Sequence, residues 1–129
     1  MLKTTLPIIE QKIENDKLVV TKKNIDVSID TSIYAEERWE ANFPTNAKNE
    51  TLFAYIERVQ NSGDLNNKAH IVSNLKALYC FLEGDAIADF KSFCQMFDMV
   101  DEEYVQELVN KIKFVFSLVL KSSTTTPKN

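Results

Sequence analysis

The stretch from Asp30 to Pro44, DTSIYAEERWEANFP, contains a helix start, the single tryptophan of the chain and a proline stop. Asp30 or Thr31 can cap a helix that begins near Ile33, because short oxygen-bearing side chains accept hydrogen bonds from the first N–H groups of a helix. Pro44 ends this helix at Phe43, since the residue before a proline avoids helical backbone angles. The apolar side chains between these limits recur every four residues and form one stripe: Ala35, Trp39 and Phe43. The pattern predicts an amphipathic helix over about residues 33–43.

Four further segments show the spacing of three and four residues that is typical of buried helix faces. They cover about residues 50–60, 65–83, 86–97 and 102–121. Only two glycines occur, and we expect Gly63 and Gly84 to follow helix C-termini, where a positive φ is favoured. The sequence therefore predicts a mainly α protein, a compact bundle of about five helices that forms a single domain over residues 1–121. We expect the polar residues 122–129 to form a flexible tail.

The N-terminal part is predicted to contain a small β-hairpin at about residues 17–29. Its two strands are rich in β-branched side chains and are joined by a turn at Lys22-Lys23-Asn24: Lys17–Thr21 and Ile25–Ile29. We expect residues 1–16 to form a short helix with Pro7 in its first turn. An isolated two-stranded hairpin is only marginally stable in water, so this hairpin must either lie on the helices or pair with another subunit. The second arrangement would make the protein a homo-oligomer.

Charge and hydropathy exclude two classes of partner. The formal net charge is -4, so the chain lacks the cationic surface that nucleic-acid backbones require. No run of apolar residues has the length of a membrane span, and residues 1–16 lack the apolar core of a secretion signal. We therefore expect a soluble cytoplasmic protein, in which the apolar surroundings of Cys80 and Cys94 keep both thiols buried and reduced.

The side chains that could act in catalysis or bind a metal do not form a recognisable catalytic or metal site. His70 is the only histidine, and together with two cysteines fourteen residues apart it cannot supply the four ligands of a zinc site. Three carboxylates on the first helix, Glu36, Glu37 and Glu40, are expected to form a solvated face near the positive end of the helix. The chain also has no glycine-rich phosphate loop or nucleophile motif. We expect no enzyme, no metal and no cofactor.

The predicted helix over 102–121 carries apolar residues on two faces. One face is filled by an inward stripe, yet Phe114 and Leu118 lie on the other side as neighbours four residues apart. They form either a contact with the N-terminal segment or an exposed binding patch. Phe81, on the outer side of the predicted helix over 65–83, presents the same choice. The candidate surface for a partner or for self-association therefore comprises Phe81, Phe114 and Leu118.

The run SIYAEERWEANFP, followed by a polar link and by TLFAYIERV, resembles the tail assembly chaperones of long-tailed phages that infect Gram-positive bacteria. The resemblance covers about residues 25–60. The residues that carry it are a tryptophan, an Asn-Phe-Pro sequence and a Leu-Phe pair that opens the second helix: Trp39, Asn42, Phe43, Pro44, Leu52 and Phe53. We expect most of them to be structural rather than to contact a partner.

The resemblance implies a protein that binds the tape measure protein in the host cell cytoplasm, keeps it soluble during tail assembly and is absent from the mature virion. It also implies self-assembly and a longer form of the chain made by ribosomal frameshifting. The main alternative is a structural piece of the particle, either a head-tail connector or a tail completion protein. A small acidic regulator of a host DNA-binding protein is a third reading, although its acidic surface would be sparse.

Overall fold

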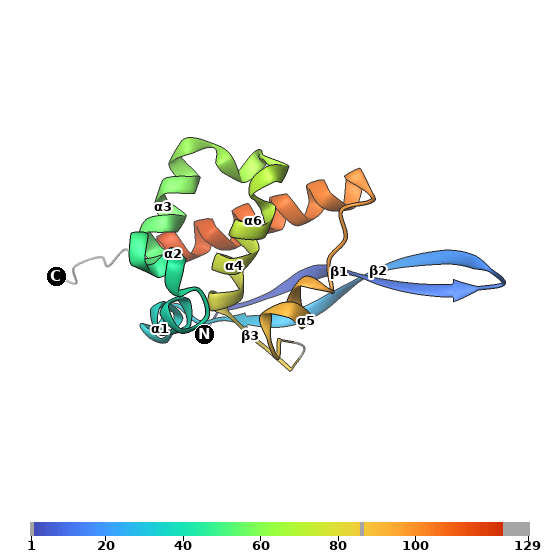
Figure 1. Ribbon diagram of the computed structural model, residues 1–129, viewed down its shortest axis with the longest axis horizontal. Helices are drawn as coiled ribbons and strands as arrows, with labels where there is room; N and C mark the ends of the chain where they lie inside the picture. Colours follow the sequence, from blue (N-terminus) through green and yellow to red (C-terminus); the bar gives the residue numbers. More distant parts are fainter. Residues whose placement is uncertain (1, 86, 123–129) are drawn as a thin grey trace.

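The computed structural model describes residues 2–85 and 87–122, of which the side chain of Ser122 is not described (Figure 1). Three strands form an antiparallel sheet in the order β1-β2-β3: β1 (Leu2–Glu14), β2 (Lys17–Ile29) and β3 (Leu82–Glu83). The α-helices are α1 (Tyr34–Asn42), α2 (Pro44–Asn49), α3 (Leu52–Ser62), α4 (Ile71–Phe81), α5 (Phe90–Cys94) and α6 (Glu102–Ser122). The expectation of a mainly α bundle is wrong, because the architecture is mixed α/β. The predicted tail at 122–129 lies outside the described residues, apart from Ser122 at the end of α6.

The largest correction concerns residues 2–14, which form strand β1 and not a short helix. The N–H group of Ile9 points away from β2, because it donates to the carbonyl of Met96 at 2.9 Å. Pro7 lies two residues earlier, so its nitrogen faces the same outer edge, and the N–H that proline lacks is not needed by the β1–β2 ladder. Proline is therefore compatible with this strand, although the sequence pattern suggested a helix start.

The hairpin is present but its turn lies at Asn15-Asp16 and not at residues 22–24. Both turn residues have positive φ, 50° at Asn15 and 62° at Asp16, and Glu14 pairs directly with Lys17. Two consecutive residues with positive φ are typical of the tight hairpin turn whose twist matches that of the flanking strands, and asparagine and aspartate tolerate this conformation. The strands are consequently much longer than predicted, with Lys22-Lys23-Asn24 inside β2.

The predictions for the helices over 33–43, 50–60 and 102–121 are confirmed by α1, α3 and α6. Gly63 follows α3 with φ 77°, as expected for a helix C-terminus. Pro44 both ends α1 and begins α2, a helix that the sequence analysis missed, because proline is well suited to a first helical position. Gly84 follows strand β3 and not a helix.

The single helix predicted over 65–83 is wrong in its limits. Two 3-10 turns, Asp64–Asn66 and Lys68–His70, precede α4, and the chain is extended at Asn67 between them. After α4 the chain extends again and pairs with β2, where Leu82 lies opposite Ile29. The helix predicted over 86–97 contracts to α5, whose N-terminus is capped by the Asp89 carboxylate at 2.8 Å from the N–H of Ser92.

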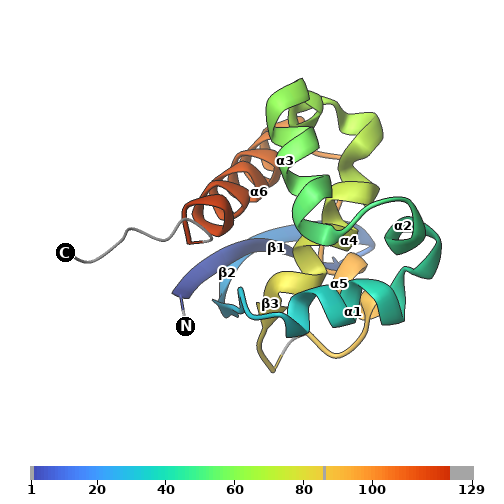
Figure 2. The ribbon, with the colours of Figure 1, turned by 90° about the vertical axis from the view of Figure 1, so that its left-hand side faces the viewer.

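Helix α6 runs along the inner half of the hairpin (Figures 1 and 2), while the outer half extends beyond the helices (Figure 1). A fully buried tyrosine joins the two elements: the Tyr104 hydroxyl donates to the carbonyl of Pro7 at 2.8 Å. Burial raises the pKa of Tyr104, so its phenol stays protonated as the donor. The hairpin is thereby fixed at its base by α6, on the edge of β1 that faces away from β2.

We expect Tyr104→Phe to lower the free energy of unfolding by about 1–3 kcal/mol, because the buried carbonyl of Pro7 loses its hydrogen-bond donor. Tyr34→Phe is the matched control, since Tyr34 is 50% exposed, and it should change stability by less than about 0.5 kcal/mol. Urea unfolding followed by circular dichroism measures both variants. If Tyr104→Phe were as stable as the unmodified protein, the Tyr104 hydroxyl would not be what holds β1 against α6.

Candidate functional site

The residues that carry the family resemblance gather around Trp39 on α1. The indole is 1% exposed and packs against the rings of Phe43 and Tyr55, with centroid distances of 5.7 and 5.6 Å. Its Nε1 donates to the carbonyl of Glu50 at 3.0 Å, which fixes the link between α2 and α3 against α1. Tryptophan therefore satisfies its polar atom while its ring fills the core.

The other residues of this motif have different environments. Leu52 is fully buried and Phe43 is 8% exposed, whereas Phe53 is half-buried. Asn42 and Pro44 are exposed at the junction of α1 and α2, where the Asn42 side chain donates to the carbonyl of Arg38 at 2.9 Å. The motif thus places three large side chains in the core and two polar or turn-forming residues at a helix junction.

Glu36 has a structural role that the sequence analysis missed. Its two carboxylate oxygens accept hydrogen bonds from the N–H groups of Leu52 and Phe53, at 2.8 and 2.9 Å. These N–H groups lie at the start of α3, where helices carry unpaired donors and a partial positive charge. Glu36 therefore caps a helix other than its own, while Glu37 and Glu40 are exposed as expected.

The candidate patch of Phe81, Phe114 and Leu118 does not form one surface. Phe81 is only 4% exposed, because α4 is covered on nearly all sides, and its expected place on an outer face is wrong. Leu118 is half-buried and packs against the core. Phe114 is 49% exposed, and it alone of the three offers a large apolar area to a partner.

Phe114 lines a groove of about 350 Å³ between α6 and the base of the hairpin, which we call the Phe114 groove. Its wall on the hairpin includes Thr5, Pro7 and Asn24. The Lys111 ammonium lies 4.9 Å from the centre of the Phe114 ring, a cation–π contact at the rim. The groove therefore presents a half-exposed aromatic ring with a cationic side chain against it.

A second exposed apolar surface lies on the outer half of the hairpin, residues 10–21, which we call the arm. Ile13, Leu18 and Val20 are 78%, 64% and 46% exposed. Ile13 lies directly opposite Leu18, and Val20 lies opposite Gln11, so all three apolar side chains project from the same face of the ribbon. This surface was not apparent from the sequence, because the turn was predicted within β2 and strand β1 was not predicted.

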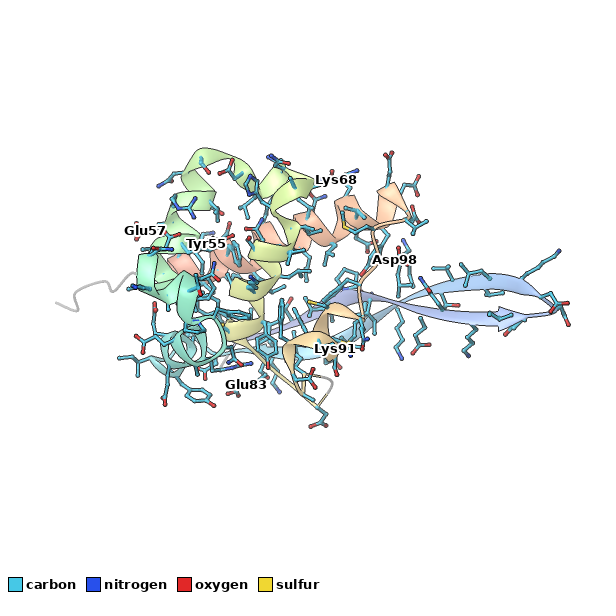
Figure 3. All side chains as sticks on the ribbon, in the orientation of Figure 1. Tyr55, Glu57, Lys68, Glu83, Lys91 and Asp98 are labelled. Carbon is cyan, nitrogen blue, oxygen red and sulfur yellow. The ribbon has the colours of Figure 1, made fainter. Side chains whose placement is uncertain are left out.

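The base of the arm is held by polar contacts to the helical body. The Gln11 side chain donates to the Asp98 carboxylate, which lies where the arm leaves the body (Figure 3). The Lys22 ammonium pairs with the Glu107 carboxylate of α6 at 3.2 Å. Both pairs are exposed, so they orient the arm more than they stabilise it.

No group of three or more potential metal ligands occurs among residues 2–85 and 87–122, and His70 is exposed. Cys80 and Cys94 are free thiols; burial raises the pKa of Cys80 to about 12, far from the range of a reactive nucleophile. In the same part of the chain, no helix has both the length and the apolar composition needed to cross a bilayer.

No family model matches the chain, and neither a curated protein nor a solved structure is similar to it. A function is therefore argued from the packed motif around Trp39 and from the two apolar surfaces, the Phe114 groove and the arm.

We expect Glu36→Ala to lower the free energy of unfolding by about 1–2 kcal/mol, since the first N–H groups of α3 lose their acceptor. Glu40→Ala, which removes an exposed carboxylate from the same helix, serves as the control and should have little effect. Chemical denaturation of both variants makes the comparison. If Glu40→Ala lowered the free energy of unfolding by as much, the loss of stability would come from the negative charge on α1 and not from the cap on α3.

We expect iodoacetamide at pH 8 to modify Cys94 in the folded protein well before Cys80. The thiolate is the reactive form, and Cys80 is fully buried with a strongly raised pKa, whereas Cys94 is half-buried. Peptide mass spectrometry at successive times measures both rates, and modification in denaturant shows that each thiol can react. Equal rates in the native protein would contradict the packing around α4.

Proposed function

We propose that this protein is a phage tail assembly chaperone that binds the tape measure protein in the host cell cytoplasm, keeps it soluble during tail morphogenesis and leaves before the virion is complete. The observation that carries the proposal is the packing of the segment that resembles this family. Three of its residues, Trp39, Phe43 and Leu52, are buried, and Trp39 and Phe43 are in ring contact. A resemblance formed by core residues of one unit supports a shared fold better than one formed by scattered surface residues.

The two exposed apolar surfaces also favour a binding protein. An arm with three exposed apolar side chains and a groove with a half-exposed phenylalanine are suited to a partner that brings apolar groups of its own. No group of three or more potential metal ligands occurs at either surface in the described part of the chain.

A tape measure protein is a client of the right chemistry. A long helix with a repeated apolar seam presents side chains at spacings of three, four and seven residues, and such seams associate unless they are covered. The Phe114 groove provides one aromatic contact for that seam, while the Lys111 ammonium beside the ring can pair with an acidic residue next to the seam. Many copies on one client would make weak individual contacts sufficient.

We expect co-expression with the tape measure protein of the same phage to keep that client in the soluble fraction. Phe114→Ser should at least halve the soluble client, because it removes the exposed aromatic ring from the groove. Val72→Ser is the matched control, since Val72 is 55% exposed on α4, away from the groove. Circular dichroism of each variant confirms folding, and a client that precipitates equally with and without the unmodified protein refutes the proposal.

Mass spectrometry of purified mature particles separates this function from the alternative of a connector or tail completion protein. A chaperone should be absent from the particle, whereas a structural piece should be present in a fixed number of copies per tail. If the peptide that contains Trp39 were detected at such a fixed ratio, the protein would be a structural component of the tail and the chaperone proposal would be wrong.

A further inference from the structure

The two faces of the arm differ in character. Side chains alternate across a strand and residues paired in the ladder share a face, so Gln11, Ile13, Leu18 and Val20 lie on one face. The other face of the arm is mostly charged or polar: Glu10, Lys12, Glu14, Lys17, Val19 and Thr21. The arm is therefore an amphipathic ribbon, with its exposed apolar side chains on a single face.

The apolar face of the arm is turned toward the start of α6. Gln11 belongs to this face, and its side chain donates to the Asp98 carboxylate in the segment between α5 and α6. Lys22, two residues along β2 from Val20, lies on the same side of the ribbon and pairs with Glu107 of α6 at 3.2 Å. The segment before α6 therefore meets the hairpin where the arm begins (Figure 3).

Two further exposed apolar residues lie in this segment. Met99 and Val100 directly follow Asp98 and are 52% and 87% exposed. The carboxylates on either side of them have a structural use, because Asp98 and Asp101 accept hydrogen bonds from the N–H groups of Val100 and Glu103, at 2.6 and 3.0 Å. The turn thus accounts for the acidic residues but not for the exposed apolar ones between them. We call the apolar residues that the Gln11–Asp98 contact brings together the arm corner: Ile13, Leu18, Val20, Met99 and Val100.

The side of the arm corner that belongs to the helical body is acidic. The sequence from Asp98 to Glu103, DMVDEE, contains four carboxylates and no basic residue. Within residues 2–85 and 87–122, only one of the four forms a salt bridge, because Glu102 lies 3.9 Å from the Lys68 ammonium. An apolar surface with an acidic border is complementary to a partner that carries basic residues beside an apolar stripe.

The arm corner can recognise side chains but not backbone groups. The backbone groups of β1 and β2 lie in the plane of the ribbon, where they form the ladder, so the face presents side chains only. A helix satisfies its own backbone hydrogen bonds and displays a stripe of side chains, which suits such a face. A lipid surface suits it less, because anionic headgroups would meet the acidic border and the polar Asn15-Asp16 turn at the tip.

We propose that the arm corner binds a basic amphipathic helix of a partner protein. The apolar stripe of this helix packs on the apolar side chains of the corner, and its lysines or arginines pair with Asp98 and Glu103. Along β2, Lys22 separates the corner from Asn24 of the Phe114 groove, where Lys111 favours an acidic partner residue. The corner is thus a second site with the opposite charge preference, and the inference does not depend on the identity of the client.

A designed peptide tests the chemistry of the site. The probe is a fluorescent peptide of about 20 residues with leucine at positions a and d of each heptad and lysine at e and g, whose mutual repulsion opposes pairing of the peptide with itself. A second peptide has glutamate in place of lysine. Fluorescence anisotropy should show binding of the lysine peptide only, and this binding should weaken as salt is added. Equal binding of the two peptides, or no binding of the lysine peptide, overturns the proposal.

Matched variants show where the peptide binds. Leu18→Ser and Val100→Ser should each weaken binding of the lysine peptide about tenfold, because each removes an exposed apolar contact. Val72→Ser, at a similarly exposed residue of α4, should change the affinity less than about twofold. Glu103→Lys should also weaken binding about tenfold, whereas Glu40→Lys makes the same change of charge on α1 and should have little effect. Circular dichroism confirms folding, and controls that weaken binding as much as the corner variants refute the assignment.

Three further measurements test other occupants. Phe114→Ser should leave peptide binding unchanged, and a loss equal to that of Leu18→Ser would place the peptide in the Phe114 groove instead. A dimer in sedimentation that Leu18→Ser dissociates, or binding to phosphatidylserine vesicles that Leu18→Ser abolishes, would mean that a second copy or a lipid surface covers the corner, and either overturns the proposal. Solubility of the client is measured separately with Phe114→Ser, so failure of the chaperone function is distinguishable from failure of this site.

Discussion

The antiparallel ladder between β1 and β2 is the constraint on which the rest of the structure depends. Each strand has thirteen residues, and every residue of one is paired with a residue of the other. Its inner half supplies buried side chains to the core and receives the hydroxyl of Tyr104 at Pro7. The same ladder continues past the last helix contact, so the backbone pairing that builds the core also projects the arm into solvent.

The helices close the core through contacts between neighbours in space that are distant in sequence. Glu36 of α1 caps α3, and the Arg38 guanidinium donates to the carbonyls of Leu82 and Cys80, at 2.7 and 3.3 Å, where α4 ends. Side chains of α1 therefore bond to terminal backbone groups of both α3 and α4, so α1 holds these two helices in place and also contributes to the core. The resemblance to tail assembly chaperones falls on α1 and the segment that it holds, whereas the proposed partner surfaces lie elsewhere, on α6 and the arm.

The Phe114 groove lies at the base of the hairpin and would contact the client of the proposed chaperone. Many copies along one long client would raise the effective concentration of each weak contact.

Periodicity in the sequence determined the helices α1, α3 and α6, because each has a long apolar stripe and a local start or stop signal such as Pro44 or Gly63. It also indicated the burial of Trp39. Strand β1 could not be found in this way, since Pro7 suggested a helix start, and only the pairing shows that its missing N–H faces an edge. Likewise, burial of Phe81 and exposure of Ile13 and Leu18 depend on which elements pack around them, and the tertiary structure alone decides that.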